Sequence, residues 1–451
     1  MSGELFGPIF VPDAFREAVC GGAWLQAMLD VEAALAVAEA RAGLIPPEDA
    51  EAIARHCDAD LFDAGEIGHR GRPAGNPVPA LARALTERVA ETSEAAARHV
   101  HRGATSQDIT DTAAMLVSRR TLDLILAEVD GIAGACARLA KEHRDTPMAG
   151  RTLLQQALPT TFGLKAAGWL VPVLEARRRL RELRASGLAA QLGGAAGTLA
   201  SLGDSGLQVL REFALELGLP EPPVPWHTDR TRISTIGEAL SLLAGVLGKI
   251  SWDVILMAQT ESGEVAEPAG EGRGSSSTLP HKRNPILSVT AAANARRVQE
   301  GARTLQAAMP QEHERAAGAW HSEWEALSDA LALAGGAAAN VREATGGLEV
   351  HPEKMRENLD ATGGMLLAEN VTTAASEKLG RLRAHDLVEA ACRRALRNDG
   401  RLREELLQDE RTREVLSEGE IDAALDPAGY LGSAGAFVDR ALGLYREEEA
   451  S

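Results

Sequence analysis

The sequence has few aromatic residues, few cysteines and no long apolar run. Phe, Trp and Tyr make up only 3% of its 451 residues, which favours helices packed through small side chains over β-sheets. The four cysteines, Cys20, Cys57, Cys136 and Cys392, lie far apart and have no metal-ligand spacing. We therefore expect a reduced, cytoplasmic chain. No apolar run approaches the ~20 residues of a membrane span, and the N-terminus has no signal-peptide pattern.

Positive charge is also in deficit. The formal net charge is −18, with 47 Lys and Arg against 65 Asp and Glu. This balance argues against nucleic acids and anionic membranes as partners, since both are bound by basic surfaces. A polyanionic small molecule would gain nothing from the overall field. Any attraction must come from a few local cations and helix ends.

Apolar residues follow helical spacing over long stretches. Those from Met115 to Leu139, and from Ile233 to Met257, recur every three or four residues, which marks one side of a long helix. Several such helices predict an all-α bundle with shallow crossing angles, and small residues such as those at 193–197 allow close approach. We expect three helical domains, at residues 1–105, 106–350 and 351–451.

The most informative segment runs from Gly272 to Pro285 and reads Gly-Arg-Gly-Ser-Ser-Ser-Thr-Leu-Pro-His-Lys-Arg-Asn-Pro. It predicts a hydroxyl-rich loop leading into a helix from about Ile286, with Asn284 as N-cap and Pro285 at the first helical position. The N–H groups of that helix start and the charge of Lys282 would face the loop, where they could stabilise a serine alkoxide or an anionic substrate. An ordinary surface turn is the alternative for a loop of this composition.

Two further segments place hydroxyl groups at expected helix starts. Thr105, Ser106 and Gln107 precede the helix that carries the first apolar seam, and Thr160 and Thr161 follow a proline. Hydroxyls and N–H groups at a helix start are suited to hold a carboxylate. For the first of these segments, a plain capping sequence is the alternative.

The loop resembles the signature of the fumarase/aspartase superfamily, whose pattern is Gly-Ser-Ser-x-Met-Pro-x-Lys-x-Asn-Pro. The matching positions are Ser276, Ser277, Pro280, Lys282, Asn284 and Pro285, and the departures are Ser275 for glycine and Leu279 for methionine. The resemblance implies that Ser276 exchanges a proton with the carbon next to a carboxylate, with Lys282 and His281 beside it. It also implies a long-helix bundle and a homotetramer with a shared helical core, with sites shared between subunits. No metal or organic cofactor is implied.

Within the superfamily, several blocks look most like those of the 3-carboxy-cis,cis-muconate cycloisomerases. They are Gly103–Asp108, Pro225–Arg232, Gln259–Pro268 and Met309–Trp324. The resemblance implies that Arg315 binds substrate, as a guanidinium suits bidentate carboxylate recognition. The alternative is a surface arginine near Glu312 or Glu314. His227 is a further candidate for substrate binding, although a lone histidine is often structural.

Two histidines of other superfamily members are missing. Adenylosuccinate and argininosuccinate lyases have histidines at the positions of Leu153 and, commonly, Asn76. An amine or hydroxide leaving group needs a general acid, whereas a carboxylate departs as a stable anion with a pKa near ~4. The sequence therefore fits intramolecular addition of a carboxylate, giving a lactone, better than elimination of an amine.

We therefore expect an enzyme that converts 3-carboxy-cis,cis-muconate to 4-carboxymuconolactone in protocatechuate catabolism. Three alternatives stay open. One is a lyase of the same fold that expels another stable anion, such as nitrite from a nitrosuccinate-like compound. The second is an adenylosuccinate-lyase-like enzyme. The third is a non-catalytic helical assembly, which the intact Ser276, Lys282 and Asn284 argue against.

Overall fold

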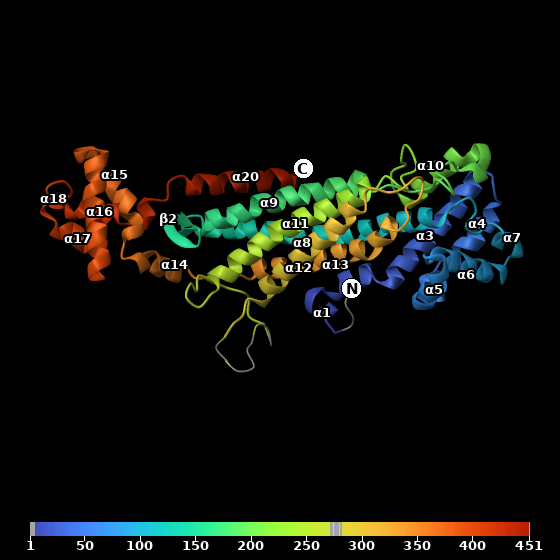
Figure 1. The fold of residues 1–451 in the computed structure, drawn as a ribbon, viewed down its shortest axis with the longest axis horizontal. Helices are drawn as coiled ribbons and strands as arrows, with labels where there is room; N and C mark the ends of the chain where they lie inside the picture. Colours follow the sequence, from blue (N-terminus) through green and yellow to red (C-terminus); the bar gives the residue numbers. More distant parts are fainter. Residues whose placement is uncertain (1–4, 271–273, 275–278, 280–281, 451) are drawn as a thin grey trace. The chain divides into compact units, whose positions relative to one another are not determined.

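Long helices make up most of the computed structural model (Figure 1). It describes all residues except 1–4, 271–273, 275–278, 280–281 and 451. The six longest helices among the described residues are α3 (Gly21–Arg41), α8 (Ser106–Glu142), α9 (Phe162–Glu182), α11 (Thr231–Met257), α12 (Ile286–Ala307) and α13 (Ala319–Gly346). The expected long-helix fold is confirmed.

Shorter helices lie at both ends of the chain. Before α8 they are α1 (Gly7–Phe10), α2 (Asp13–Ala18), α4 (Pro47–Ala54), α5 (Ala64–Gly71), α6 (Val78–Ala90) and α7 (Glu94–Ala97). After α9 they are α10 (Gly206–Leu217), α14 (Pro352–Leu359), α15 (Ala368–Leu379), α16 (Arg381–Asn398), α17 (Leu402–Gln408), α18 (Glu410–Arg413), α19 (Glu418–Ala424) and α20 (Ala434–Ala450).

The two predicted seams are buried. Each residue at a seam position, from Met115 to Leu139 on α8 and from Ile233 to Met257 on α11, is at most 4% exposed. Close packing through small residues is also found: a Cβ on Gly301 of α12 would lie 3.3 Å from Cβ of Ala330 on α13. The three- and four-residue spacing was therefore a correct guide to the buried side of each helix.

Helix α11 also meets a length and composition criterion for a membrane span. Its most apolar window of 18 residues has a mean hydropathy of 1.6, and 44% of that window is buried inside the protein. It is the one helix of the described chain that does so. The buried seam accounts for the same composition, because a helix packed inside a bundle also needs apolar residues.

Two short antiparallel sheets were not expected. The first pairs β1 (Pro147–Thr152) with β2 (Gln155–Thr161), and the second pairs β3 (Val265–Ala266) with β4 (Glu349–Val350). Thr160 and Thr161 thus end a strand, and α9 starts immediately after them. The helix start was predicted correctly, but the strand before it was missed.

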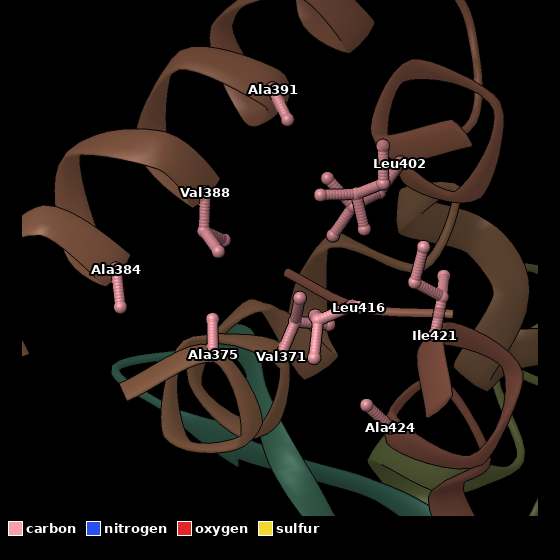
Figure 2. Packing of buried hydrophobic residues seen from close by; sticks show 10 residues of the cluster. Val371, Ala375, Ala384, Val388, Ala391, Leu402, Leu416, Ile421 and Ala424 are labelled. Atoms are coloured by element: carbon pink, nitrogen blue, oxygen red, sulfur yellow. The ribbon is translucent and has the colours of Figure 1, made fainter. Parts of the chain in front are cut away.

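The chain divides into two compact units, each built from segments that are distant in sequence. The first comprises residues 1–130, 175–248 and 290–340, and the second comprises residues 131–174, 249–289 and 341–451. The second unit contains a C-terminal core in which α15, α16, α17 and α19 bury small and branched side chains such as Val371, Val388, Leu402 and Ile421 (Figure 2). The three-domain division drawn from the sequence stays a prediction.

Candidate active site

Asp108, on the first turn of α8, is the centre of a buried hydrogen-bond network in the first unit. Its Oδ2 accepts the backbone N–H groups of Thr105 (3.0 Å) and Gly194 (2.9 Å), and its Oδ1 accepts that of Gly193 (2.9 Å). Nε2 of His227 lies 2.6 Å from the same Oδ1. Since the carboxylate already acts as an acceptor, this ring nitrogen must be the donor. Asp108 thereby fixes both the Gly193 loop and the tautomer of His227.

Glycine is required in this loop. A Cβ on Gly193 would lie 2.6 Å from Cε1 of His227 and 2.8 Å from Cβ of Pro225. Gly194 has φ +69, a conformation that residues with a side chain rarely adopt. The Gly-Gly pair therefore lets the backbone approach the histidine and direct two N–H groups at one carboxylate.

Arg315 binds the outer side of the same loop. Its Nη2 donates to the carbonyl oxygens of Gly194 (2.6 Å) and Ala195 (3.1 Å), and its Nη1 donates to that of Glu314 (2.7 Å). It forms no ion pair with a described residue. Burial lowers the pKa of Arg315, and the charge of Asp108 opposes that shift. The guanidinium is oriented but its charge is not neutralised at contact distance, which suits an anion-binding residue.

A buried ion cluster is joined to this network through Asp111, which bonds both Gln107 and Arg230. Arg230 is 1% exposed and bonds Asp111 through Nη1 (2.8 Å) and Nη2 (3.0 Å), and Glu323 through Nη2 (2.6 Å). Nε1 of Trp320 donates to Oδ1 of Asp111 over 3.0 Å. Burial raises the pKa of Glu323, and the hydrogen bond from Arg230 acts in the opposite sense. Two acids share one arginine, so the cluster depends on that arginine to stay buried.

The three predicted residues at the start of α8 differ in what they can do. Thr105 and Ser106 are partly exposed, and neither hydroxyl has a hydrogen-bond partner among the residues that the structure describes. Gln107 is 2% exposed, and its Nε2 donates to Asp111 (3.1 Å) and to the His227 carbonyl (2.8 Å). The hydroxyls are available to a ligand, whereas Gln107 ties the network together. Its expected contact with substrate stays a prediction.

In the second unit, the expected capping of α12 by Asn284 is wrong. Nδ2 of Asn284 donates to the Gly274 carbonyl over 3.0 Å and so closes the base of the loop. The carboxylate of Glu267 accepts the N–H groups of Leu287 (3.0 Å) and Ser288 (2.7 Å) instead. Glu267 is buried, and its negative charge matches the positive end of the helix. These two N–H groups are therefore not open to substrate.

Lys282 and the two threonines of β2, Thr160 and Thr161, are the other predicted site residues of the second unit that the structure describes. Lys282 is exposed and has no carboxylate partner among the described residues, so its charge is available to a ligand. Oγ1 of Thr161 accepts the N–H of Leu164 over 3.0 Å and so caps α9, and its expected contact with substrate stays a prediction. Thr160 is partly exposed.

Three predicted residues, Ser276, Ser277 and His281, lie outside the described residues. The structure brings together Thr105, Ser106, Gln107, His227 and Arg315 in the first unit, and it places Thr160, Thr161, Lys282 and Asn284 in the second.

Asp108 and Glu267 were missed as functional positions. Asp108 had a signal, since it stands three residues after Thr105 as a capping carboxylate would. Glu267 had none, because it is 20 residues from the helix that it caps.

A family model described as "Lyase" matches residues 12–300, and one described as "Adenylosuccinate lyase C-terminus" matches residues 364–441. The chain belongs to the fumarase/aspartase superfamily. A 3-carboxy-cis,cis-muconate cycloisomerase of Bradyrhizobium diazoefficiens is 47% identical over 97% of both chains. A nitrosuccinate lyase of Streptomyces davaonensis is 45% identical over 97% of this chain and 94% of that protein.

The crystal structure of the 3-carboxy-cis,cis-muconate lactonizing enzyme of Pseudomonas putida is similar to this fold, with a TM-score of 0.94. The two proteins are 43% identical over 99% of each chain. This superfamily member therefore supports the long-helix fold over its whole length. Among the described residues, no group of three or more His, Cys, Asp or Glu side chains could hold a metal ion.

Proposed function

We propose that the protein converts 3-carboxy-cis,cis-muconate to 4-carboxymuconolactone. The observation that carries this proposal is the chemistry at the two positions where amine-eliminating superfamily members have a histidine. Leu153 cannot donate a proton, and the Asn76 side chain is engaged in its own turn, donating to the Ala74 carbonyl and accepting the Val78 N–H. A carboxylate leaving group needs no acid there.

In this reaction one substrate carboxylate adds to the substrate's own double bond and forms a carbon–oxygen bond. The electron pair moves to the neighbouring carbon, where an adjacent carboxylate stabilises it. The Ser276 hydroxyl delivers its proton to that carbon, and in the reverse direction its alkoxide removes it. Lys282 and His281 would stabilise the alkoxide, as developing negative charge is best stabilised by fixed donors.

The remaining candidates would hold the three substrate carboxylates. In the first unit Thr105 and Ser106 offer two hydroxyls without a described partner, Arg315 offers a guanidinium without an ion pair among the described residues, and His227 is a further candidate. In the second unit Thr160, Ser277 and Asn284 would do the same, with Thr161 maintaining the start of α9, and Gln107 maintains the network of the first unit. Binding several carboxylates with oriented donors places the reacting atoms together.

A shared site in a homotetramer is part of the proposal. The hairpin between β1 and β2 turns at Leu153 and Leu154, which have φ 52 and 66 and are 97% and 77% exposed. Two leucines at a strained, open turn are costly in water unless another surface covers them. Exposed Leu242, Trp252 and Leu256 on α11 support the same interpretation. We also place the enzyme in the cytoplasm.

Elimination of nitrite from nitrosuccinate is a second candidate. Nitrite is another stable anion, and the Streptomyces davaonensis relative carries that name at 45% identity. An adenylosuccinate-lyase-like elimination is disfavoured, since the amine would need the missing acid.

The direct experiment follows the loss of diene absorbance when the purified protein is mixed with 3-carboxymuconate. Nitrosuccinate is tested in parallel by nitrite release. Ser276→Ala should lower turnover by ~10²-fold or more, while Ser275→Gly, which restores the usual loop residue, should be mild. Nitrite release without lactone formation would replace the first assignment with the second.

A further inference from the structure

His321 contacts two tryptophans at the start of α13. Its ring centroid lies 5.2 Å from that of Trp320, edge to face, and 4.9 Å from that of Trp324, in a tilted arrangement. The two tryptophan rings are themselves edge to face, 4.9 Å apart. Aromatic contacts of this kind orient a ring without using its polar atoms. The imidazole is therefore fixed in direction, although the residue is exposed.

Both ring nitrogens of His321 lack a hydrogen-bond partner among the described residues. His227 differs, because Asp108 takes one of its nitrogens. An imidazole that is oriented by its carbon edges and has unused nitrogens is prepared for a ligand rather than for a structural contact.

His321 lies beside the turn that contains Gly75 and Asn76. Gly75 has φ +70, and a Cβ there would lie 3.7 Å from Nε2 of His321. The imidazole thus stands beside the turn that contains Asn76. The Asn76 side chain is engaged within its own turn, through Ala74 and Val78. His321 accordingly places its imidazole beside a turn whose Asn76 side chain is already engaged.

A cavity of about 340 Å³ adjoins Trp324, and its lining also includes Pro77 of the same turn, Thr110 of α8 and Glu325, but not His321 itself. Thr110 lies one helical turn after Ser106, whose carbonyl it bonds over 3.1 Å. Trp320 connects the aromatic group to Asp111 of the buried ion cluster. Trp324, the turn that contains Asn76, and Thr110 of α8 therefore border one cavity of the first unit.

We infer that His321 contacts the substrate and donates an N–H to one of its carboxylates, with Trp320 and Trp324 as the wall that orients it. This rests on the proposed polycarboxylate chemistry. The role is in binding and positioning, since a carboxylate that adds to a double bond needs no proton from this side.

Equilibrium binding tests the inference apart from catalysis. Propane-1,2,3-tricarboxylate, which has no double bond to react, is titrated calorimetrically into the wild type and His321→Ala. Loss of a hydrogen bond to a charged group should weaken binding about 10-fold or more, and His321→Gln, which keeps an N–H donor, should recover part of it. The control is His385→Ala, an exposed histidine on α16, which should bind as the wild type does.

The aromatic wall is tested by Trp324→Phe. Nε1 of Trp324 has no acceptor among the described residues, so phenylalanine loses ring area but no hydrogen bond. We expect a several-fold weaker tricarboxylate affinity and a raised KM with a smaller change in kcat.

Equal affinities for wild type and His321→Ala, or no saturable binding to the wild type at millimolar probe, would overturn the inference. Weakened binding by His321→Ala in a protein that forms no lactone would retain the inference and reject the proposed reaction. The two failures are therefore distinguishable.

Discussion

Asp108 and His227 are joined by a short contact, 2.6 Å between Oδ1 and Nε2, although 119 residues separate them in sequence. Both side chains are buried. The contact links the start of α8 to the segment that leads into α11, and the Gly193 loop closes over it.

Asp108→Asn should impair the enzyme without unfolding it. An amide of the same size has only one acceptor oxygen, so its NH2 group must face N–H groups that Oδ1 or Oδ2 of Asp108 accepts in the wild type. Loss of a hydrogen bond to a charged group costs about 1.5–3 kcal/mol, so kcat/KM should fall roughly 10- to 100-fold. Asp60→Asn makes the same chemical change on an exposed site and should leave kcat/KM unchanged. Wild-type activity in Asp108→Asn would show that the pair is not needed.

Arg230→Met should destabilise the protein strongly, because it leaves Asp111 and Glu323 buried without their cation. Removing one partner of a buried ion pair costs about 3–5 kcal/mol. The free energy of unfolding in urea measures this. Arg403→Met is the matched control, since Arg403 also bridges two acids, Glu418 and Asp422, but at the surface, where salt screens such pairs. Similar losses of unfolding free energy in Arg230→Met and Arg403→Met would show that burial does not make the Arg230 ion pairs more important for stability.

Glu39 makes stability depend on pH. It is 0% exposed, neither of its carboxyl oxygens has a described partner, and burial raises its pKa to about 8 against the pull of Arg102. Between about pH 4.5 and 8 the native state keeps a proton that the unfolded state has released. The stabilisation present at low pH is thus lost as pH rises, by roughly 1.4 kcal/mol per unit for this group.

Glu39→Gln removes this titration. The difference in unfolding free energy between Glu39→Gln and wild type should grow in favour of the variant as pH rises from 5 to 8. Glu48→Gln, on the exposed face of α4, provides the matched comparison. Parallel stability curves for Glu39→Gln and wild type would show that Glu39 is not protonated in the native state.

Glu267→Ala should reduce both stability and activity. It removes the carboxylate that accepts two N–H groups of α12, and loss of a cap costs about 1–2 kcal/mol. Activity should fall because Lys282 and Asn284 directly precede this helix. Ser417→Ala removes the cap of α19, so it should destabilise comparably while kcat/KM stays normal. Equal kcat/KM in Glu267→Ala and Ser417→Ala would show that the capping of α12 by Glu267 does not affect the active site.

Two inactive variants should restore each other if sites are shared between subunits. Thr105→Ala alters a residue of the first unit and Ser276→Ala a residue of the serine loop, so mixed tetramers would contain some sites with neither change. Refolding the two together should recover part of the activity, while refolding each alone should not. A monomer by light scattering at assay concentration would exclude this arrangement.

The sequence by itself determined the helices and the kind of chemistry. The seams on α8 and α11 follow from a period that any apolar face must keep, and the starts of α8 and α9 were marked by local capping residues. The serine loop and the absent histidines at 76 and 153 indicated the reaction class, because leaving-group chemistry depends on which side chains are present.

Only the tertiary structure decided which groups are occupied and which are available. Glu267, rather than Asn284, caps α12, and Asp108 rather than a ligand receives the N–H groups of Thr105, Gly193 and Gly194. His321 was one unassigned histidine among several until its rings and neighbours were placed. The contacts of Glu267 with α12 and of Asp108 with Gly193 and Gly194 join residues 20 to 86 positions apart. Local propensity carries no information about them, since the chain must fold before their partners are near.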